Sequence, residues 1–204
     1  MSHSGQEIEA KFYVSDLHKI TTRLHELEAR LIQSRQLEIN LRFDLPDGSF
    51  RSTGRVLRLR QDTLARLTYK GDSQTRQGVL VRQEIEMVVE DFEKGREFLE
   101  ALGYQVSMIY EKYRTTYELN ETLVMLDEMP FGHFVEVEGE TLEHIQDVSG
   151  QLGLDWNAAI GAGYTSLFEN VKKSLKLPFR DLSFENFEGI KVTPGNLDVV
   201  SAYE

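Results

Sequence analysis

The 204-residue chain has no cysteine, which excludes disulfide bonds and thiolate metal sites, and with them the small secreted proteins that disulfides hold together. It also has no apolar run of about eighteen residues, and no cationic segment followed by an apolar one at its start. Neither a membrane-spanning helix nor a secretory signal is therefore predicted. The expectation is a cytoplasmic protein without a membrane partner.

Positive charge is scarce, because 23 lysines and arginines stand against 34 aspartates and glutamates, a formal net charge of -11. This charge disfavours binding of nucleic acid over the whole surface, although a locally basic cleft still attracts phosphate groups. The length suits one substantial core. We expect one domain over residues 1–175 and an irregular tail over residues 176–204, where prolines and glycines interrupt any period. The oligomeric state stays open, a homodimer included.

Apolar and charged residues alternate along much of the chain. Residues 6–14 have the two-residue period of a strand with one apolar and one charged face, and similar patterns predict strands over residues 36–44, 55–62, 64–70, 81–90, 110–119, 123–129 and 133–139. Helices are expected over residues 15–30, with Ser15 as the N-cap, and over residues 91–102, 143–152 and 163–175. Residues 71–78 are polar, contain two glycines and are predicted to form a mobile loop.

Eight such strands with few helices predict an α+β fold, an eight-stranded antiparallel closed β-barrel with a charged interior and helices packed outside. For any one strand, the charged face is also typical of the solvated side of an open sheet. A small soluble barrel usually fills its interior with apolar side chains, so a charged interior is useful only if it holds a charged ligand.

The charged faces carry acids and bases in equal numbers, grouped by strand. The acids are Glu7, Glu9, Glu84, Glu86, Asp127, Glu136 and Glu138, and the bases are Lys11, Arg58, Arg60, Lys70, Arg82, Lys112 and Arg114. Mg²⁺ and Mn²⁺ prefer carboxylate, phosphate and water oxygens, whereas arginine and lysine suit phosphate oxygens. The two groups together are complementary to a metal-bound polyphosphate.

Several short motifs follow one another in order: Glu-Ile-Glu-Ala-Lys at residues 7–11, Leu-Arg-Leu-Arg at 57–60, Leu-Thr-Tyr-Lys-Gly at 67–71, Arg-Gln-Glu-Ile-Glu at 82–86, Glu-Lys-Tyr-Arg at 111–114, and Leu-Asp at 126–127 followed by Phe-Val-Glu-Val-Glu at 134–138. Each piece alone also occurs by chance. The ordered set resembles the CYTH superfamily, the triphosphate tunnel metalloenzymes, over roughly residues 7–170.

The resemblance implies an eight-stranded tunnel that binds a triphosphate and divalent cations, Mg²⁺ or Mn²⁺. Carried over by motif, the expected metal ligands are Glu7, Glu9, Asp127, Glu136 and Glu138, and the expected phosphate-binding residues are Arg58, Arg60, Lys70, Arg82, Lys112 and Arg114. Glu9 and Lys11 are the expected catalytic residues, with Lys11 positioning water or phosphate. Glu84 and Glu86 are expected to support the site by orienting the cations.

The resemblance favours a metal-dependent enzyme that cleaves a phosphoanhydride bond, with a small-molecule triphosphate as its partner: inorganic triphosphate first, then ATP or thiamine triphosphate. A class IV adenylyl cyclase, which converts ATP to cyclic AMP and pyrophosphate, is one alternative. A non-catalytic binder of polyphosphate or nucleotide is the other. Outside the motifs, Arg66 lies on the charged side of its strand, and Tyr110 is predicted to pack across strands.

Overall fold

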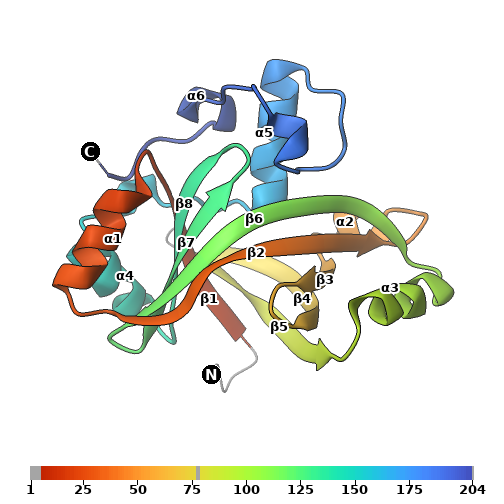
Figure 1. The fold of residues 1–204 in the computed structure, drawn as a ribbon, viewed down its shortest axis with the longest axis horizontal. Coiled ribbons are helices and arrows are strands. Elements are labelled where there is room, and N and C mark those ends of the chain that lie inside the picture. Colours follow the sequence, from red (N-terminus) through yellow and green to blue (C-terminus); the bar gives the residue numbers. More distant parts are fainter. Residues whose placement is uncertain (1–5, 77–78, 204) are drawn as a thin grey trace.

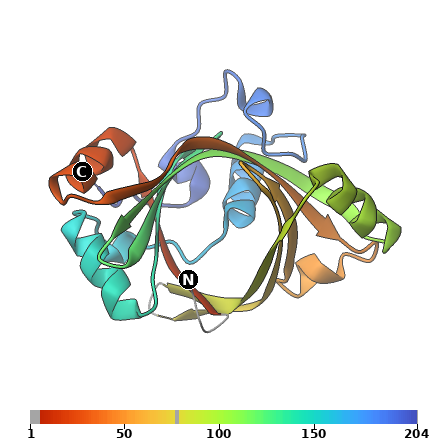
Figure 2. The same ribbon diagram turned by 60° about the horizontal axis from the view of Figure 1, so that its bottom comes forward.

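Eight antiparallel strands close into a barrel in the computed structural model, which describes residues 6–76 and 79–203 and the side chains of residues 8–72 and 82–203. The strands are neighbours in the order β1-β5-β4-β3-β2-β6-β7-β8, and pairing of β1 with β8 completes the ring (Figure 1, Figure 2). They are β1 (Gln6–Val14), β2 (Arg30–Asp44), β3 (Val56–Gln61), β4 (Ala65–Arg76), β5 (Val79–Val89), β6 (Gln105–Leu119), β7 (Thr122–Met129) and β8 (Gly132–Glu138). The predicted closed barrel is confirmed.

Helices cover the outside of this barrel. They are α1 (Leu17–Glu26), α2 (Ser49–Ser52), α3 (Phe92–Ala101), α4 (Leu142–Gln151), α5 (Tyr164–Leu175) and α6 (Pro194–Leu197), with short 3-10 turns η1 (Trp156–Ala158) and η2 (Glu185–Phe187). In both ribbon views α1 and α4 lie on one side of the barrel and α3 on the other (Figure 1, Figure 2). None of the helices within the described ranges is long and apolar enough to cross a membrane.

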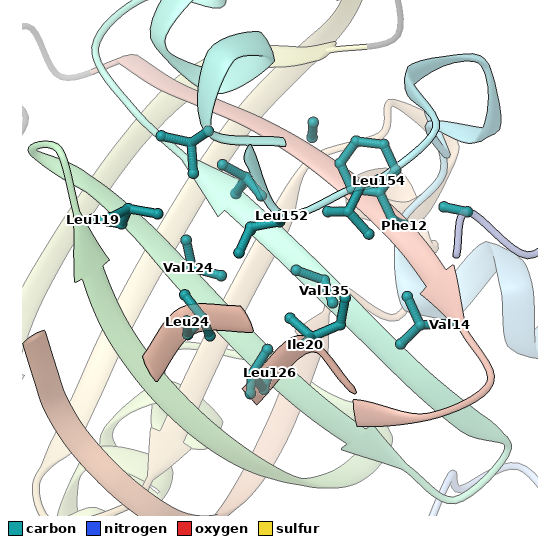
Figure 3. Packing of buried hydrophobic residues seen from close by; sticks show 14 of the residues in the cluster. Phe12, Val14, Ile20, Leu24, Leu119, Val124, Leu126, Val135, Leu152 and Leu154 are labelled. Atoms are coloured by element: carbon teal, nitrogen blue, oxygen red, sulfur yellow. The ribbon is translucent and has the colours of Figure 1, made fainter. Parts of the chain in front are cut away.

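The apolar face of β1, β7 and β8 points outward and holds α1 and α4. Ile20 and Leu24, four residues apart on one face of α1, are fully buried in a cluster with Val124 and Val135 of the barrel (Figure 3). A second cluster joins Leu99 of α3 to the strands beneath it. Because alternate residues of each strand are committed to these outer contacts, the remaining ones must face the barrel interior.

The C-terminal part of the chain packs against one end of the barrel. We call this the α5 end; β1 and β7 finish there, and β6 and β8 begin there. Leu182 and Leu197 are fully buried there beside Phe134 and Phe168. The amide of Leu182 donates to the carbonyl of Ile109 on β6. Residues 176–203 are irregular apart from η2 and α6, yet they are part of the packed structure.

Several predicted boundaries are wrong. Helix α1 is capped by Asp16, whose carboxylate accepts from the amide of His18, instead of by Ser15, and it ends at Glu26. Strands β2 and β6 each begin about five residues earlier than predicted. The expected loop at 71–78 is strand through Arg76, paired with β5 after a bulge, while residues 77–78 lie outside the described residues. The ends of these strands are set by cross-strand backbone pairing, which no side-chain pattern reports.

Candidate functional site

Charged side chains from all but one of the strands line a cavity of about 770 Å³ inside the barrel, which we call the lumen. This volume lies within the range of small-molecule sites. Among the described residues, the lining cations are Lys11, Arg42, Arg58, Arg60, Arg66, Lys70, Arg82, Lys112 and Arg114, and the lining carboxylates are Glu9, Glu38, Asp62, Glu84, Glu86, Glu136 and Glu138. The protein is strongly acidic overall, yet these nine cations outnumber the seven carboxylates around the lumen.

The acidic part of the lumen lies where β1 pairs with β8. The Lys11 ammonium is 2.6 Å from Glu136 and 3.7 Å from Glu9, and Glu9 is directly opposite Glu138 across the two strands. Burial alone would lower the pKa of Lys11, but Glu136 and Glu9 outweigh burial and raise that pKa above its usual value. Lys11 therefore stays protonated at neutral pH.

These carboxylates fit a divalent metal of the hard, oxygen-binding kind. Mg²⁺ is usually held by one or two protein carboxylates together with substrate phosphates and water, and Glu9 and Glu138 offer such a pair. Over the side chains that the structure describes, no group of three or more acidic or histidine residues is arranged as a complete cage. The backbone of Glu7 lies in β1, while its side chain lies outside the described residues. The arrangement suits a metal that arrives with phosphate ligands.

The basic part of the lumen is formed by β3, β4 and β5. Arg60 lies 3.5 Å from Glu38, 3.5 Å from Asp62 and 3.4 Å from Glu86. Lys70 lies 3.1 Å from Glu84. Glu84 and Glu86 thus contact the cations that the motifs assign to phosphate, and their supporting role stays a prediction. A charged interior is tolerable because cations and carboxylates compensate each other there.

Asp127, one of the five expected metal ligands, is placed differently. It is fully buried and does not line the lumen. Its oxygens accept from Lys112 at 2.9 Å, from Arg114 at 2.6 Å twice, and from the hydroxyl of Tyr164 at 2.7 Å. Burial and then Asp127 raise the pKa of Tyr164 well above its usual value. These hydrogen bonds from three residues are the contacts expected of a counter-ion.

Several lumen residues were missed by sequence reasoning. Glu38 and Arg42 lie two positions either side of Asn40 on β2, and the alternation of that strand was a signal that could have found them. Tyr164 belongs to α5, and the alternation of strand residues cannot predict which side chains of a helix face the lumen. Tyr110 packs in the cluster that contains Phe134, and it also lines the lumen, with its hydroxyl 3.3 Å from Arg58. Arg66 faces the lumen as its parity indicates.

The carboxylate of Glu38 gives a prediction about pH. Burial raises its pKa, but Lys112, Arg114 and Arg60 outweigh burial and lower it from 4.5 to about 2. A carboxylate with a depressed folded-state pKa stabilises the protein above its unfolded-state pKa, and the contribution is lost as pH falls toward the folded-state value. It amounts to on the order of 3 kcal/mol. Urea unfolding of the wild type and Glu38→Gln should therefore differ most above about pH 4.5, and the difference should shrink toward pH 2. A constant difference over this range would contradict the prediction.

Comparisons with known proteins agree with this geometry. Residues 5–152 match the CYTH domain family. A Methanocaldococcus jannaschii protein named "Putative adenylate cyclase" is 27% identical over 172 residues, which cover 79% of this chain and 97% of that protein. A solved "putative adenylate cyclase" from Vibrio parahaemolyticus is similar with a TM-score of 0.72 at 19% identity, covering 80% of this chain and 97% of that one. A Hippeastrum "putative adenylyl cyclase", whose structure is described as revealing a dominant triphosphatase activity, is similar with a TM-score of 0.63 at 20% identity, covering 80% and 95%.

Proposed function

This chain belongs to the CYTH domain family, and from that premise we propose that it is a divalent-metal-dependent enzyme that binds a triphosphate in the lumen and hydrolyses a phosphoanhydride bond, with inorganic triphosphate as the favoured substrate. The observation that carries the proposal is that the carboxylate pair on β1 and β8 shares one cavity with nine cations, eight of which lie on other strands. A metal-bound polyphosphate carries the complementary charges: its cation suits the carboxylates, and its phosphate oxygens suit the guanidinium and ammonium groups.

The residues divide the work by position. Arg58, Arg60, Lys70, Arg82, Lys112 and Arg114 bind the phosphates. Glu9 and Glu138 hold the metal, with Glu7 two residues before Glu9 on β1. When bound, the metal polarises a phosphoryl oxygen and lowers the pKa of a water. Lys11 stays protonated, so it acts as a hydrogen-bond donor that orients phosphate or water and not as a general base. The fixed guanidinium groups stabilise charge on the leaving phosphate.

Class IV adenylyl cyclase is the second candidate, because part of the lumen wall is apolar. Ile32 and Leu123 line the cavity away from the α5 end, and the sulfur of Met125, which also lines it, accepts a hydrogen bond from Arg114. An organic group attached to the triphosphate has a surface to pack on there. In that reaction the ribose 3′-hydroxyl replaces water as the nucleophile, and the same cations bind the phosphates.

The deciding experiment incubates the purified protein with Mg²⁺ or Mn²⁺ and each of three substrates: inorganic triphosphate, ATP and thiamine triphosphate. We expect phosphate and pyrophosphate from inorganic triphosphate. Cyclic AMP and pyrophosphate from ATP, without release of phosphate, would replace the hydrolase by the cyclase. Tight binding of triphosphate without turnover of any substrate would overturn both enzymes in favour of a binding protein.

Arg60→Ala is expected to weaken triphosphate binding, raising KM more than it lowers kcat. A hydrogen bond to a charged group contributes about 1.5 to 3 kcal/mol, which corresponds to roughly ten- to a hundredfold in KM. Arg35→Ala is the matched control, because Arg35 also pairs with a carboxylate, that of Glu128, but does not line the lumen. Steady-state kinetics with inorganic triphosphate test both variants. Equal KM values for Arg60→Ala and the control would contradict the assignment.

A further inference from the structure

Arg42 is a lumen cation that none of the sequence motifs contains. It lies on β2 directly opposite Arg58 of β3, so two guanidinium groups occupy one cross-strand pair. Like charges placed opposite each other on neighbouring strands are destabilising. An anion bound between the two guanidinium groups would offset this repulsion.

No carboxylate in the described part of the chain forms an ion pair with Arg42. Its Nη1 donates to the hydroxyl of Thr165 in the first turn of α5. Asp44, the next residue on the same face of β2, accepts instead from the backbone amides of Leu45, Phe50 and Arg51. By contrast, Lys11, Arg60, Arg66, Lys112 and Arg114 each have a carboxylate within 4 Å. Burial, with further contributions from Arg58 and Arg82, lowers the pKa of Arg42.

Buried polar atoms without partners lie beside this pair. Asn40, two residues before Arg42 on β2, is fully buried and does not line the lumen, and neither its amide nitrogen nor its amide oxygen has a hydrogen-bond partner. The Nε of Arg58 is also buried without a partner. The lumen residues Gln33, Glu38 and Arg60 also have such atoms. Because an unsatisfied buried polar atom costs about 1 to 3 kcal/mol, the unpaired Nε of Arg58 indicates a ligand that completes it.

We propose that Arg42 and Arg58 form a subsite for the terminal phosphoryl group of the substrate at the α5 end of the lumen. The inference rests on the proposed function and adds the orientation in which the triphosphate lies in the lumen. The first turn of α5, with Gly163, Tyr164 and Thr165, borders this part of the cavity and limits its size. A small, highly charged phosphoryl end fits, whereas an esterified end does not. An organic substituent must then point toward the opposite mouth, where Ile32 and Leu123 line the lumen.

The segment that borders this subsite is not part of the family match, which ends at residue 152. Thr165 fixes the guanidinium of Arg42 from that segment. The subsite is therefore built from one strand pair of the barrel and from a helix that follows it. Arg42 is accordingly a specificity-determining residue that selects a free phosphoryl end, while the six cations of the motifs bind the chain of phosphates.

Calorimetric titration of the full-length protein with three probes tests the subsite: inorganic triphosphate and ATP, which have a free phosphoryl end, and diadenosine triphosphate, which has none. The wild type should bind the first two at least tenfold more tightly than the third. Arg42→Gln should weaken binding of the first two by about tenfold or more and of the third by less than threefold. Arg42→Lys, which keeps the charge, should recover part of the loss. Arg51→Ala is the matched control, since the exposed Arg51 also contacts α5, through Glu169 3.5 Å away.

The outcomes separate this subsite from the proposed function. Equal binding of inorganic triphosphate by Arg42→Gln and the wild type would overturn the subsite and leave the proposed function standing. A wild type that binds no triphosphate would overturn both. An equal loss of affinity in Thr165→Val, which keeps the guanidinium but removes its hydroxyl partner, would assign Arg42 to anchoring α5 and overturn its contact with phosphate. Equal affinity of the wild type for all three probes would also overturn the selection of a free end.

Discussion

Glu9→Gln is expected to reduce metal-dependent turnover by at least about a hundredfold while the barrel stays folded. The proposed metal site offers few protein ligands, with Glu9 and Glu138 opposite each other on β1 and β8, so loss of one carboxylate charge removes much of the site. Substitution of residues that only support metal ligands already costs about ten- to a hundredfold in affinity or activity. The measurement is phosphate release from inorganic triphosphate over a range of Mg²⁺ and Mn²⁺ concentrations.

The same variant should bind triphosphate without metal at least as well as the wild type. The carboxylate of Glu9 repels phosphate when no cation lies between them, and glutamine does not. Calorimetric titration in the presence of a chelator measures this effect. Glu128→Gln is the control, because Glu128 pairs with Arg35 and does not line the lumen. Full turnover by Glu9→Gln at low metal concentration would remove Glu9 from the site.

The barrel could be predicted because its signal is local. Alternation along Gln6–Val14 assigns Glu9 and Lys11 to one face, and the outward face packs against helices as the apolar residues require. Strand ends could not be predicted in the same way. Residues 71–76 are polar, yet they continue β4, because pairing with β5 satisfies their backbone groups whatever the side chains are. The predicted strands are too short wherever backbone pairing continues beyond the alternating apolar and polar residues.

The candidate site was predictable in its motifs and not in its counter-ions. Lys11, Arg58 and Arg60 lie on the lumen as their strand parity indicates. Glu38 lies on β2, outside every motif, although it is within 4 Å of both Arg60 and Lys112. The role of Asp127 depends on Tyr164, which is 37 residues further along the chain and belongs to a helix. Contacts of this kind are set by tertiary packing, and a sequence period carries no information on them.

These counter-ions explain how an acidic protein maintains a basic lumen. An unpaired guanidinium in the interior is costly to desolvate, and replacing both partners of a buried pair by apolar residues is often stabilising. The pairs around Arg60 and Lys112 therefore contribute mainly by holding these cations in position, and not by stabilising the fold. Apolar clusters under α1, α4 and α5 supply the burial that keeps the barrel folded around this polar interior. Stability and binding are assigned to opposite faces of the same strands.

Asp127→Asn is expected to destabilise the metal-free protein by about 3 to 5 kcal/mol, the cost of removing one partner of a buried ion pair. The substitution takes a full negative charge from Lys112 and Arg114, for which Glu38 and Glu136 remain as counter-ions. At roughly 2 to 4 °C per kcal/mol for a domain of this size, Tm should fall by at least about 6 °C. Calorimetry or circular dichroism in the presence of a chelator measures the change.

Tyr164→Phe separates the charge of Asp127 from its hydrogen bonds. It removes one donor to Asp127 and keeps the ring, which lies 4.5 Å from the Lys11 ammonium and 5.3 Å from that of Lys112. The loss should be about 1 kcal/mol, the usual contribution of one hydrogen bond. If Asp127 bound metal instead, Asp127→Asn would leave the metal-free Tm nearly unchanged and would raise the metal concentration needed for turnover. The two roles therefore predict opposite results in the chelated protein, where a counter-ion is still required and a metal ligand is not.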